Sequence, residues 1–251
     1  MAPRPPERTL LSWSGGKDSA LALQALRADA AVRVDALVTT VTDSHDRVSM
    51  HGVRRALLEQ QADALGVPLR VVRIPPACTN ADYEAAFGAA LIAWAGEGGS
   101  AVAFGDLFLA DVRAYREQLV AAHAPRLAAR FPLWGADTAA TARRFVADGF
   151  RAVLVCVDPR QVDAALAGRE YDAQLLADLP VGADPCGENG EFHTFVYDGP
   201  GFRRPVPVAR GEAVMRDGFA HCDLLPAGAG PRDSTAPPPP PGTLTSPRAA
   251  G

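Results

Sequence analysis

The sequence predicts an α/β protein in which a parallel sheet carries helices on both faces, followed by a smaller α+β portion. Short apolar runs rich in β-branched residues alternate with segments of helical periodicity through the first half of the chain. Such alternation is typical of a parallel sheet, because a helix must cross over between neighbouring parallel strands. The 251 residues, 48% of them hydrophobic, are enough to bury the core that this fold needs.

Four strands and four helices are expected in the first portion. The strands are predicted at residues 9–13, 32–41, 69–74 and 101–104. The helices are predicted at residues 20–28, 52–65, 80–96 and 108–123. Gly66 and Pro68 end the second helix, because glycine readily takes the left-handed conformation and proline cannot continue a helix. Asn80 is expected to cap the third helix.

The second portion is less regular. The predicted elements are a helix at 138–148, an apolar strand at 152–157, a loop at 182–190 and β-like segments at 193–197 and 211–224. Residues 216–218, Arg-Asp-Gly, are typical of a hairpin turn. The chain is therefore divided into an N-terminal tail at 1–8, a first domain at 9–134, an α+β domain at 135–226 and a Pro-rich tail at 227–251. The composition of this last segment predicts disorder, because it cannot bury a core.

Composition excludes several classes of protein. The net charge of −4 lacks the basic bias of a simple nucleic-acid binder. No apolar run approaches the ~20 residues that span a bilayer, and the first eight residues lack the apolar stretch of a secretory signal. A cytoplasmic location is expected. The four cysteines are widely spaced, which argues against a disulfide scaffold or a zinc ribbon.

Lysine is nearly absent from the chain. Of the 25 basic residues one is lysine, Lys17, and the remaining 24 are arginine. A genome that disfavours lysine codons would explain why lysine is scarce, but it would not explain why the remaining lysine is at position 17. A site that needs a compact, flexible ammonium group would resist replacement by the planar guanidinium of arginine. Lys17 is therefore a candidate functional residue.

The strongest motif joins the first predicted strand to the first helix. It is the phosphate loop, residues 14–19, with the sequence Ser14-Gly15-Gly16-Lys17-Asp18-Ser19. Its glycines let the backbone approach a ligand, the helix start presents N–H groups, and Lys17 adds a full charge. This combination predicts a cradle for phosphate or pyrophosphate. It is not a Walker A loop, because Leu11 replaces the first glycine and Asp18 replaces the Ser or Thr after lysine.

The phosphate loop resembles the PP-loop of the N-type ATP pyrophosphatases, in the adenine nucleotide alpha hydrolase superfamily. The resemblance implies a Rossmann-like (HUP-type) sheet and an enzyme that splits ATP between its α and β phosphates. All six loop residues are then expected to bind ATP, with Lys17 and Asp18 also catalytic. Open α/β sheets bind ligands at the carboxyl ends of their strands, which adds Thr39, Gly105 and Asp106 to the ATP site. Asp106 is also a candidate ligand for Mg²⁺, with capping of the next helix as the alternative.

A second dense motif, the signature loop, occupies residues 184–195 with the sequence Asp-Pro-Cys-Gly-Glu-Asn-Gly-Glu-Phe-His-Thr-Phe. A loop this rich in hydrogen-bonding groups more often serves a ligand than a core. Glu188 and Glu191 could bind an ammonium ion, accept a proton from an amine, or hold Mg²⁺. The alternative is a solvated turn at Asn189-Gly190. Cys186 could be a nucleophile or a small packing residue.

The signature loop resembles the C-terminal signature of the diphthine–ammonia ligase family, a branch of the same superfamily. The resemblance extends to residues 50–54, 105–106 and 132–134, and covers most of the chain from about Leu10 to Phe202. It implies ATP-dependent amide formation, in which a carboxylate is adenylated, pyrophosphate leaves, and ammonia displaces AMP. The carboxylate in that family belongs to diphthine; here the acceptor is left open as a small molecule or a protein side chain.

The same resemblance assigns further residues. Glu188 and Glu191 are implied to be catalytic. The residues implied to bind substrate are His51, Arg113, Cys186, Asn189 and His193. The implied partners are ATP, Mg²⁺, ammonia and the acceptor, with no membrane and no nucleic acid, and the oligomeric state is left open.

Two other functions remain alternatives. One is a tRNA-modifying sulfur or amine transferase built on the same loop, although the chain lacks a basic tract interleaved with aromatic residues and a paired cysteine motif. The other is a non-catalytic ATP-binding module, since a fold does not fix a function. The two carboxylates of the signature loop argue against simple nucleotide holding.

Overall fold

The computed structural model describes residues 5–43, 47–48 and 52–227. The strands are β1 (Glu7–Ser12), β2 (Val32–Thr42), β3 (Arg47–Val48), β4 (Leu69–Ile74), β5 (Ala101–Ala103), β6 (Ala128–Arg130), β7 (Arg151–Val157), β8 (Phe192–Asp198), β9 (Val208–Arg216) and β10 (Phe219–Pro226). The helices are α1 (Lys17–Ala28), α2 (Arg55–Leu65), α3 (Asn80–Gly96), α4 (Ala110–His123), α5 (Thr138–Ala147) and α6 (Ala173–Asp178), with a short 3₁₀ turn, η1 (Ala164–Leu166).

The first sheet is Rossmann-like. Five parallel strands lie in the order β4-β2-β1-β5-β6, and β3 pairs antiparallel with the end of β2. From β1 the chain adds β2 and β4 on one side, and it then crosses to add β5 and β6 on the other side of β1. The strand order therefore reverses between β1 and β5, and ligands of such folds bind at this switch point. The phosphate loop follows β1 at this point. The predicted parallel sheet is therefore confirmed.

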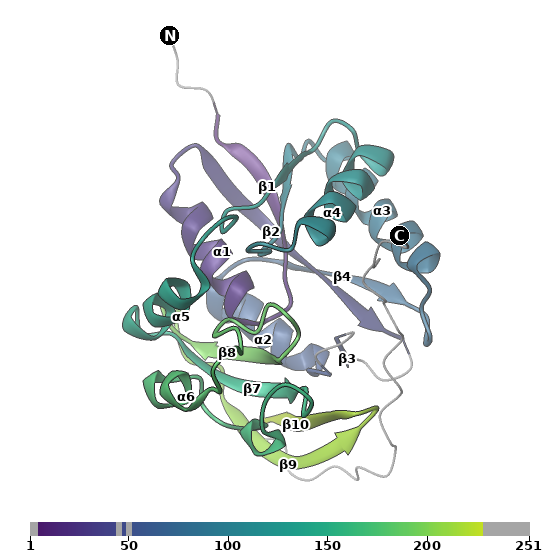
Figure 1. Ribbon diagram of the computed structural model, residues 1–251. Coiled ribbons are helices and arrows are strands. Elements are labelled where there is room, and N and C mark those ends of the chain that lie inside the picture. The colour runs from purple at the N-terminus through teal and green to yellow at the C-terminus, as the bar shows by residue number, and fades with distance from the viewer. Residues whose placement is uncertain (1–4, 44–46, 49–51, 228–251) are drawn as a thin grey trace.

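Both faces of this sheet are covered, as predicted. Alternate strand residues face opposite sides, so that Leu10 and Val38 pack with α3 and α4, whereas Leu11 and Leu37 pack with α1 and α2. The second sheet is antiparallel, in the order β8-β7-β10-β9. Figure 1 shows it below α1 and α2, on the side away from α3 and α4. One apolar core includes α1, α2 and this second sheet, so α1 is buried on more than one side.

Several boundaries differ from the sequence prediction. β1 begins at Glu7, inside the predicted tail, because Glu7 to Thr9 pair with the start of β2. The cap of α3 is Thr79, not Asn80: Thr79 Oγ1 accepts from the Asp82 N–H at 3.2 Å. The segment predicted at 211–224 is a hairpin, β9 and β10, whose turn places Asp217 and Gly218 at positive φ, as the predicted turn requires.

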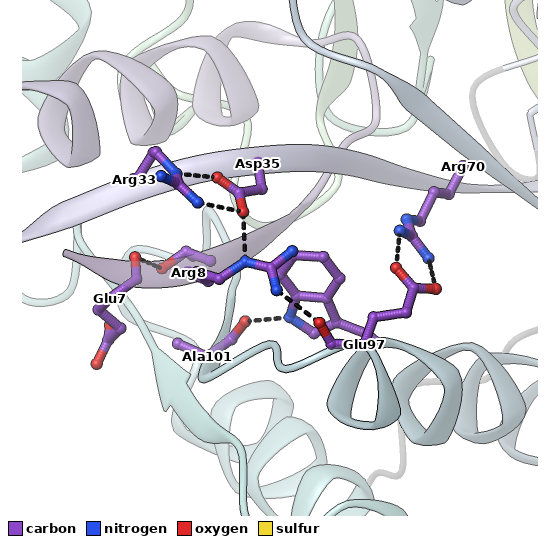
Figure 2. A network of polar contacts seen from close by, with 9 residues as sticks. Glu7, Arg8, Arg33, Asp35, Arg70, Glu97 and Ala101 are labelled. Carbon is purple, nitrogen blue, oxygen red and sulfur yellow. Dashed lines mark hydrogen bonds and ion pairs between the residues drawn. The ribbon is translucent and has the colours of Figure 1, made fainter. Parts of the chain in front are cut away.

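Polar contacts close the amino edge of the first sheet, opposite the phosphate loop. Figure 2 shows Asp35 of β2 receiving hydrogen bonds from Arg33 and from Arg8 of β1. Arg70 of β4 forms a bidentate pair with Glu97 at the end of α3, at 2.8 and 2.5 Å. Arg8 also donates to the Glu97 carbonyl. This edge is therefore occupied by protein contacts, and the carboxyl edge is the one that faces the second sheet.

One carboxylate ties the second sheet to the segment before α2. Asp223 of β10 accepts hydrogen bonds from Arg47 at 2.8 and 3.2 Å and from Arg54 at 3.3 and 2.5 Å. Burial alone would raise the pKa of Asp223, but the two guanidinium groups hold that pKa below its usual range. Asp223 therefore joins residues on both sides of positions 49–51 to the second sheet.

We expect Asp223→Asn to lower the free energy of unfolding by about 1–3 kcal/mol, because two half-buried guanidinium groups lose their counter-charge. Urea unfolding at neutral pH measures this change. Asp43→Asn is the matched control, because Asp43 pairs with Arg73 where both side chains are about half exposed, at 53% and 51%. That control should lose less than about 1 kcal/mol. Equal losses in the two variants would contradict a special role for Asp223.

In the parts of the chain that the structure covers, no helix combines the length and the apolar character needed to cross a bilayer. The predicted Pro-rich tail lies outside the described residues from position 228 onward, and the domain boundaries remain predictions.

Candidate functional site

The phosphate loop is tightly enclosed. Gly15 has φ +82°, and a Cβ there would lie 2.6 Å from Leu58 Cδ2 and 2.9 Å from Gln61 Oε1. Gly16 precedes α1 without any side-chain cap, and a Cβ there would lie 3.0 Å from the Thr194 carbonyl oxygen. Both positions therefore require glycine, one for conformation and space and the other for the close approach of β8.

Lys17 is the buried cation of the site. Its residue is 2% exposed, and Nζ donates to Asp18 Oδ1 at 2.5 Å. Burial lowers the pKa of Lys17, but the attraction of neighbouring acidic groups, Asp18 above all, outweighs burial, and the net direction is upward. Lys17 thus keeps its charge at neutral pH inside the protein.

Three carboxyl groups lie around this ammonium group. Burial raises the pKa of Asp18 against the opposing effect of Lys17, and burial also raises the pKa of Asp106. Burial, together with the charge of Asp18, raises the pKa of Glu188 to about 8. The Leu107 N–H reaches Glu188 Oε2 at 3.4 Å, so the segment after β5 approaches the signature loop. Several acidic groups thus share this edge with Lys17 and Arg116, and a bound cation would favour the ionised forms of these carboxyl groups.

Two buried oxygens at the carboxyl edge have no hydrogen-bond partner within the part of the chain that the structure describes. They are Oδ2 of Asp106, after β5, and Oγ1 of Thr39, in β2. Arg116 Nε lies 3.8 Å from Asp106 Oδ2, too far for a hydrogen bond, and that N–H also has no partner among the described residues. Unpaired buried oxygens suit a ligand that brings donors or a cation. Gly105 packs against this region, since a Cβ there would lie 3.0 Å from the backbone of Asp18.

These oxygens fit Mg²⁺ only in part. No three His, Cys, Asp or Glu side chains gather into a metal-binding group within the described residues. Mg²⁺ commonly binds to one or two carboxylates together with substrate phosphates and water. Asp106 and Asp18 lie close enough to interact electrostatically, and together they could supply one or two carboxylates. A cation bound by them would need phosphate oxygens and water to complete its coordination.

Glu191 organises the signature loop from within. It is 1% exposed, and its Oε1 accepts from the Asp184 N–H at 2.8 Å and from Asn189 Nδ2 at 3.1 Å. Its Oε2 accepts from the Asn189 N–H at 3.0 Å. The Glu188 N–H in turn donates to Asp184 Oδ2 at 2.8 Å. These contacts favour an ordering role for Glu191, and its catalytic assignment remains a prediction; Glu188 faces the phosphate loop.

Of the other residues expected to bind substrate, Cys186 lies close enough to Lys17 and Glu188 for their charges to affect the pKa of its thiol, and His193 and Arg113 lie on separate elements. Cys186 is buried and donates to the Thr138 carbonyl at 3.3 Å, and His193 lies in β8 opposite Cys156. Arg113 lies on α4, where its guanidinium stacks 4.7 Å from the centre of the Trp134 ring and bonds to Glu117 at 2.8 Å. His51 lies outside the described residues.

Three residues that the sequence analysis did not assign to the site hold the phosphate loop. Thr194 Oγ1, in β8, accepts from the Lys17 N–H at 3.0 Å, and the Val196 N–H donates to the Gly15 carbonyl at 2.9 Å. Gln61, on α2 and fully buried, contacts the same carbonyl. A polar residue on the apolar face of a predicted helix was the available signal for Gln61, because buried amides need nearby partners.

The fold and these contacts define a class: Rossmann-like α/β proteins whose first loop is enclosed by a C-terminal antiparallel sheet. The diphthamide synthase N-terminal domain model matches residues 7–113, and the diphthamide synthase C-terminal domain model matches residues 137–224. The chain belongs to the diphthamide synthase family. It is also similar to a diphthine–ammonia ligase of Danio rerio, with 30% identity over 101 residues. That match covers 37% of this chain and 39% of the relative, so the chain spans well under two thirds of that protein.

Proposed function

We propose that this protein is an ATP-dependent amide ligase, which activates a carboxylate as an acyl adenylate and then transfers ammonia. Membership of the diphthamide synthase family supports this proposal, as does the similarity to a diphthine–ammonia ligase. The observation that carries it is the buried ammonium group of Lys17 in a glycine loop at the switch point of the sheet. Such a group can stabilise the charge that develops on a departing pyrophosphate.

The proposed ATP site combines the phosphate loop with three residues at the carboxyl edge. The loop, residues 14–19, would hold the phosphates, Thr39 would face the nucleoside, and Gly105 would allow close approach. Asp106, with Asp18, would hold Mg²⁺, which supplies charge neutralisation of the phosphates when bound.

In the proposed reaction a carboxylate oxygen attacks the α-phosphorus of ATP, and the bond to pyrophosphate breaks. Ammonia then attacks the carbonyl carbon, the bond to AMP breaks, and Glu188 accepts the proton that nitrogen loses. The residues proposed to contact the acceptor are those expected from the sequence: His51, Arg113, Cys186, Asn189 and His193. Asn189 and Glu191 would also keep the signature loop in shape through their hydrogen bonds.

Thiol chemistry is less well supported. Burial raises the pKa of Cys186 to about 12 and that of Cys156 to about 12, and it also raises the pKa of Cys78 and Cys222. Sulfur transfer needs a thiolate nucleophile, and these environments oppose thiolate formation at neutral pH. The buried cysteines therefore favour the amide ligase over a sulfur transferase.

The test is an ATP–pyrophosphate exchange assay with labelled pyrophosphate, Mg²⁺ and a diphthine-containing protein, followed by product analysis after ammonia is added. The expected products are AMP, pyrophosphate and an amide in equal amounts. ADP and phosphate as products would overturn the proposal. A protein that binds ATP but shows no exchange, with diphthine or with cell extract, would instead be a non-catalytic ATP-binding module.

A further inference from the structure

Gln61 lies at the junction of three elements. It is on α2, it is 0% exposed, and its side-chain amide contacts the residue just after β1, the phosphate loop and β8. Its Oε1 accepts from Trp13 Nε1 at 2.9 Å, and its Nε2 donates to the Gly15 carbonyl at 3.0 Å and to the Val196 carbonyl at 2.5 Å. The amide therefore has a partner for its oxygen and two for its nitrogen.

The chemistry of these partners fixes the orientation of the amide. The indole N–H of Trp13 can only donate, so it must face the amide oxygen. The carbonyls of Gly15 and Val196 can only accept, so they must face the amide nitrogen, which has two N–H groups. A flipped amide would oppose like groups at all three contacts. Glutamine is thus suited to this position, and neither glutamate nor an apolar residue can make the same set of bonds.

The geometry of Gly15 adds a second observation. Gly15 takes φ +82°, and its carbonyl accepts from both Gln61 Nε2 and the Val196 N–H. Gln61 therefore fixes the peptide that sets the direction of the loop just before Lys17. It also fixes the distance between that peptide and β8, because one nitrogen bridges the two carbonyls.

We infer that Gln61 is the positioning residue of the phosphate loop, and that its side-chain amide holds the loop against the C-terminal sheet in the form that binds the nucleotide phosphates. The effect on nucleotide rests on the proposed function; the effect on the loop does not. Gln61 does not need to touch ATP for this role. It acts through the carbonyl of Gly15 and so through the placement of Lys17.

The first test separates the loop from its ligand. Gln61→Met keeps most of the side-chain volume but removes both donors, and Gln118→Met, at an exposed position of α4, is the matched control. Hydrogen exchange without nucleotide should speed up about tenfold or more in the peptide spanning residues 13–17 of the Gln61 variant, because its opening costs less. The control should exchange like the wild type. Unchanged exchange in a folded Gln61→Met protein would overturn the inference.

The second test uses ATP. Gln61→Glu should weaken ATP binding, measured by calorimetry, about tenfold or more at neutral pH, because a carboxylate would face two carbonyl oxygens. Binding should recover as the pH falls, since the protonated acid regains one O–H donor, and Gln118→Glu should follow the wild type. If Gln61→Glu weakened ATP binding only by disturbing the structure, lowering the pH would not restore binding. ATP binding by this variant that stays weak at every pH would therefore overturn the inference.

A wild-type protein that binds no ATP would instead refute the proposed function, and the exchange experiment would still decide the role of Gln61. If Gln61→Met does not fold, Trp13→Phe removes the indole donor that orients the amide and leaves a smaller aromatic ring in its place. Hydrogen exchange in residues 13–17 of the Trp13→Phe protein should also speed up, but by less than in Gln61→Met. Unchanged exchange in the Trp13→Phe protein would overturn the inference.

Discussion

Lys17→Ala should abolish pyrophosphate release while the protein stays folded. The variant removes the cation that is expected to meet the developing charge on pyrophosphate, and the loss of such a group typically costs about 100-fold to 1,000-fold in rate. Lys17→Arg should fail as well, because the 2%-exposed site around Nζ leaves no room for a planar guanidinium group. The measurement is the initial rate of AMP formation, with thermal unfolding as the check on folding.

Arg126→Ala is the control for the loss of a positive charge, because Arg126 is an exposed residue of the loop after α4. It should keep full activity. A Lys17→Arg protein that turns over like the wild type would refute the role given to the ammonium group.

Glu188→Gln should slow the ammonia-dependent step by about 100-fold and remove its dependence on pH. The pKa of Glu188 is raised to about 8, so this carboxyl group is mostly protonated at neutral pH and becomes a base as the pH rises through that value. The wild-type kcat/KM for the nucleophile should therefore rise through about pH 8, and the variant should lack this rise. Hydroxylamine in place of ammonia avoids a contribution from the titration of ammonium itself.

The same residue gives a test that needs no substrate. The pKa of Glu188 is higher in the folded protein than its ordinary value of 4.5, so its contribution to stability is complete below that value and is lost as the pH rises through about 8. Glu188→Gln should therefore raise the melting temperature above about pH 8 and change it little in acid. Glu59→Gln, at an exposed position of α2, is the control and should not show this pattern. A parallel shift at every pH would contradict the raised pKa.

Local patterns predicted much of the first sheet. The strand expected at 69–74 is β4 without any shift, and its alternation with helices placed it in a parallel sheet. Short elements escaped prediction because tertiary contacts create them. β6 has the sequence Ala-Ala-Arg, with no β-branched residue, and exists because it pairs with β5. α6 lies in a stretch without a clear helical period and is stabilised by Asp172, whose carboxylate accepts from the Leu175 N–H at 2.7 Å.

The candidate site was predictable where its residues are consecutive and unpredictable where distant segments meet. The phosphate loop follows β1 as expected, because Gly15, Gly16 and the start of α1 form a local motif. The contact between Lys17 and Thr194 joins residues that are 177 positions apart, and no periodicity in either segment encodes it. The signature loop was expected to supply two reactive carboxylates, whereas the structure shows one of them, Glu191, bonded inside its own loop.

The enclosure of the phosphate loop by β8 affects when that loop can reach its final form during synthesis of the chain. The loop is among the first residues to leave the ribosome, but the hydroxyl of Thr194 and the Val196 N–H that hold it are made much later. Contacts so distant in sequence form late, because a long stretch of chain must first be ordered. We therefore expect a nascent or prematurely terminated chain to contain the complete motif without the contacts that hold it in place.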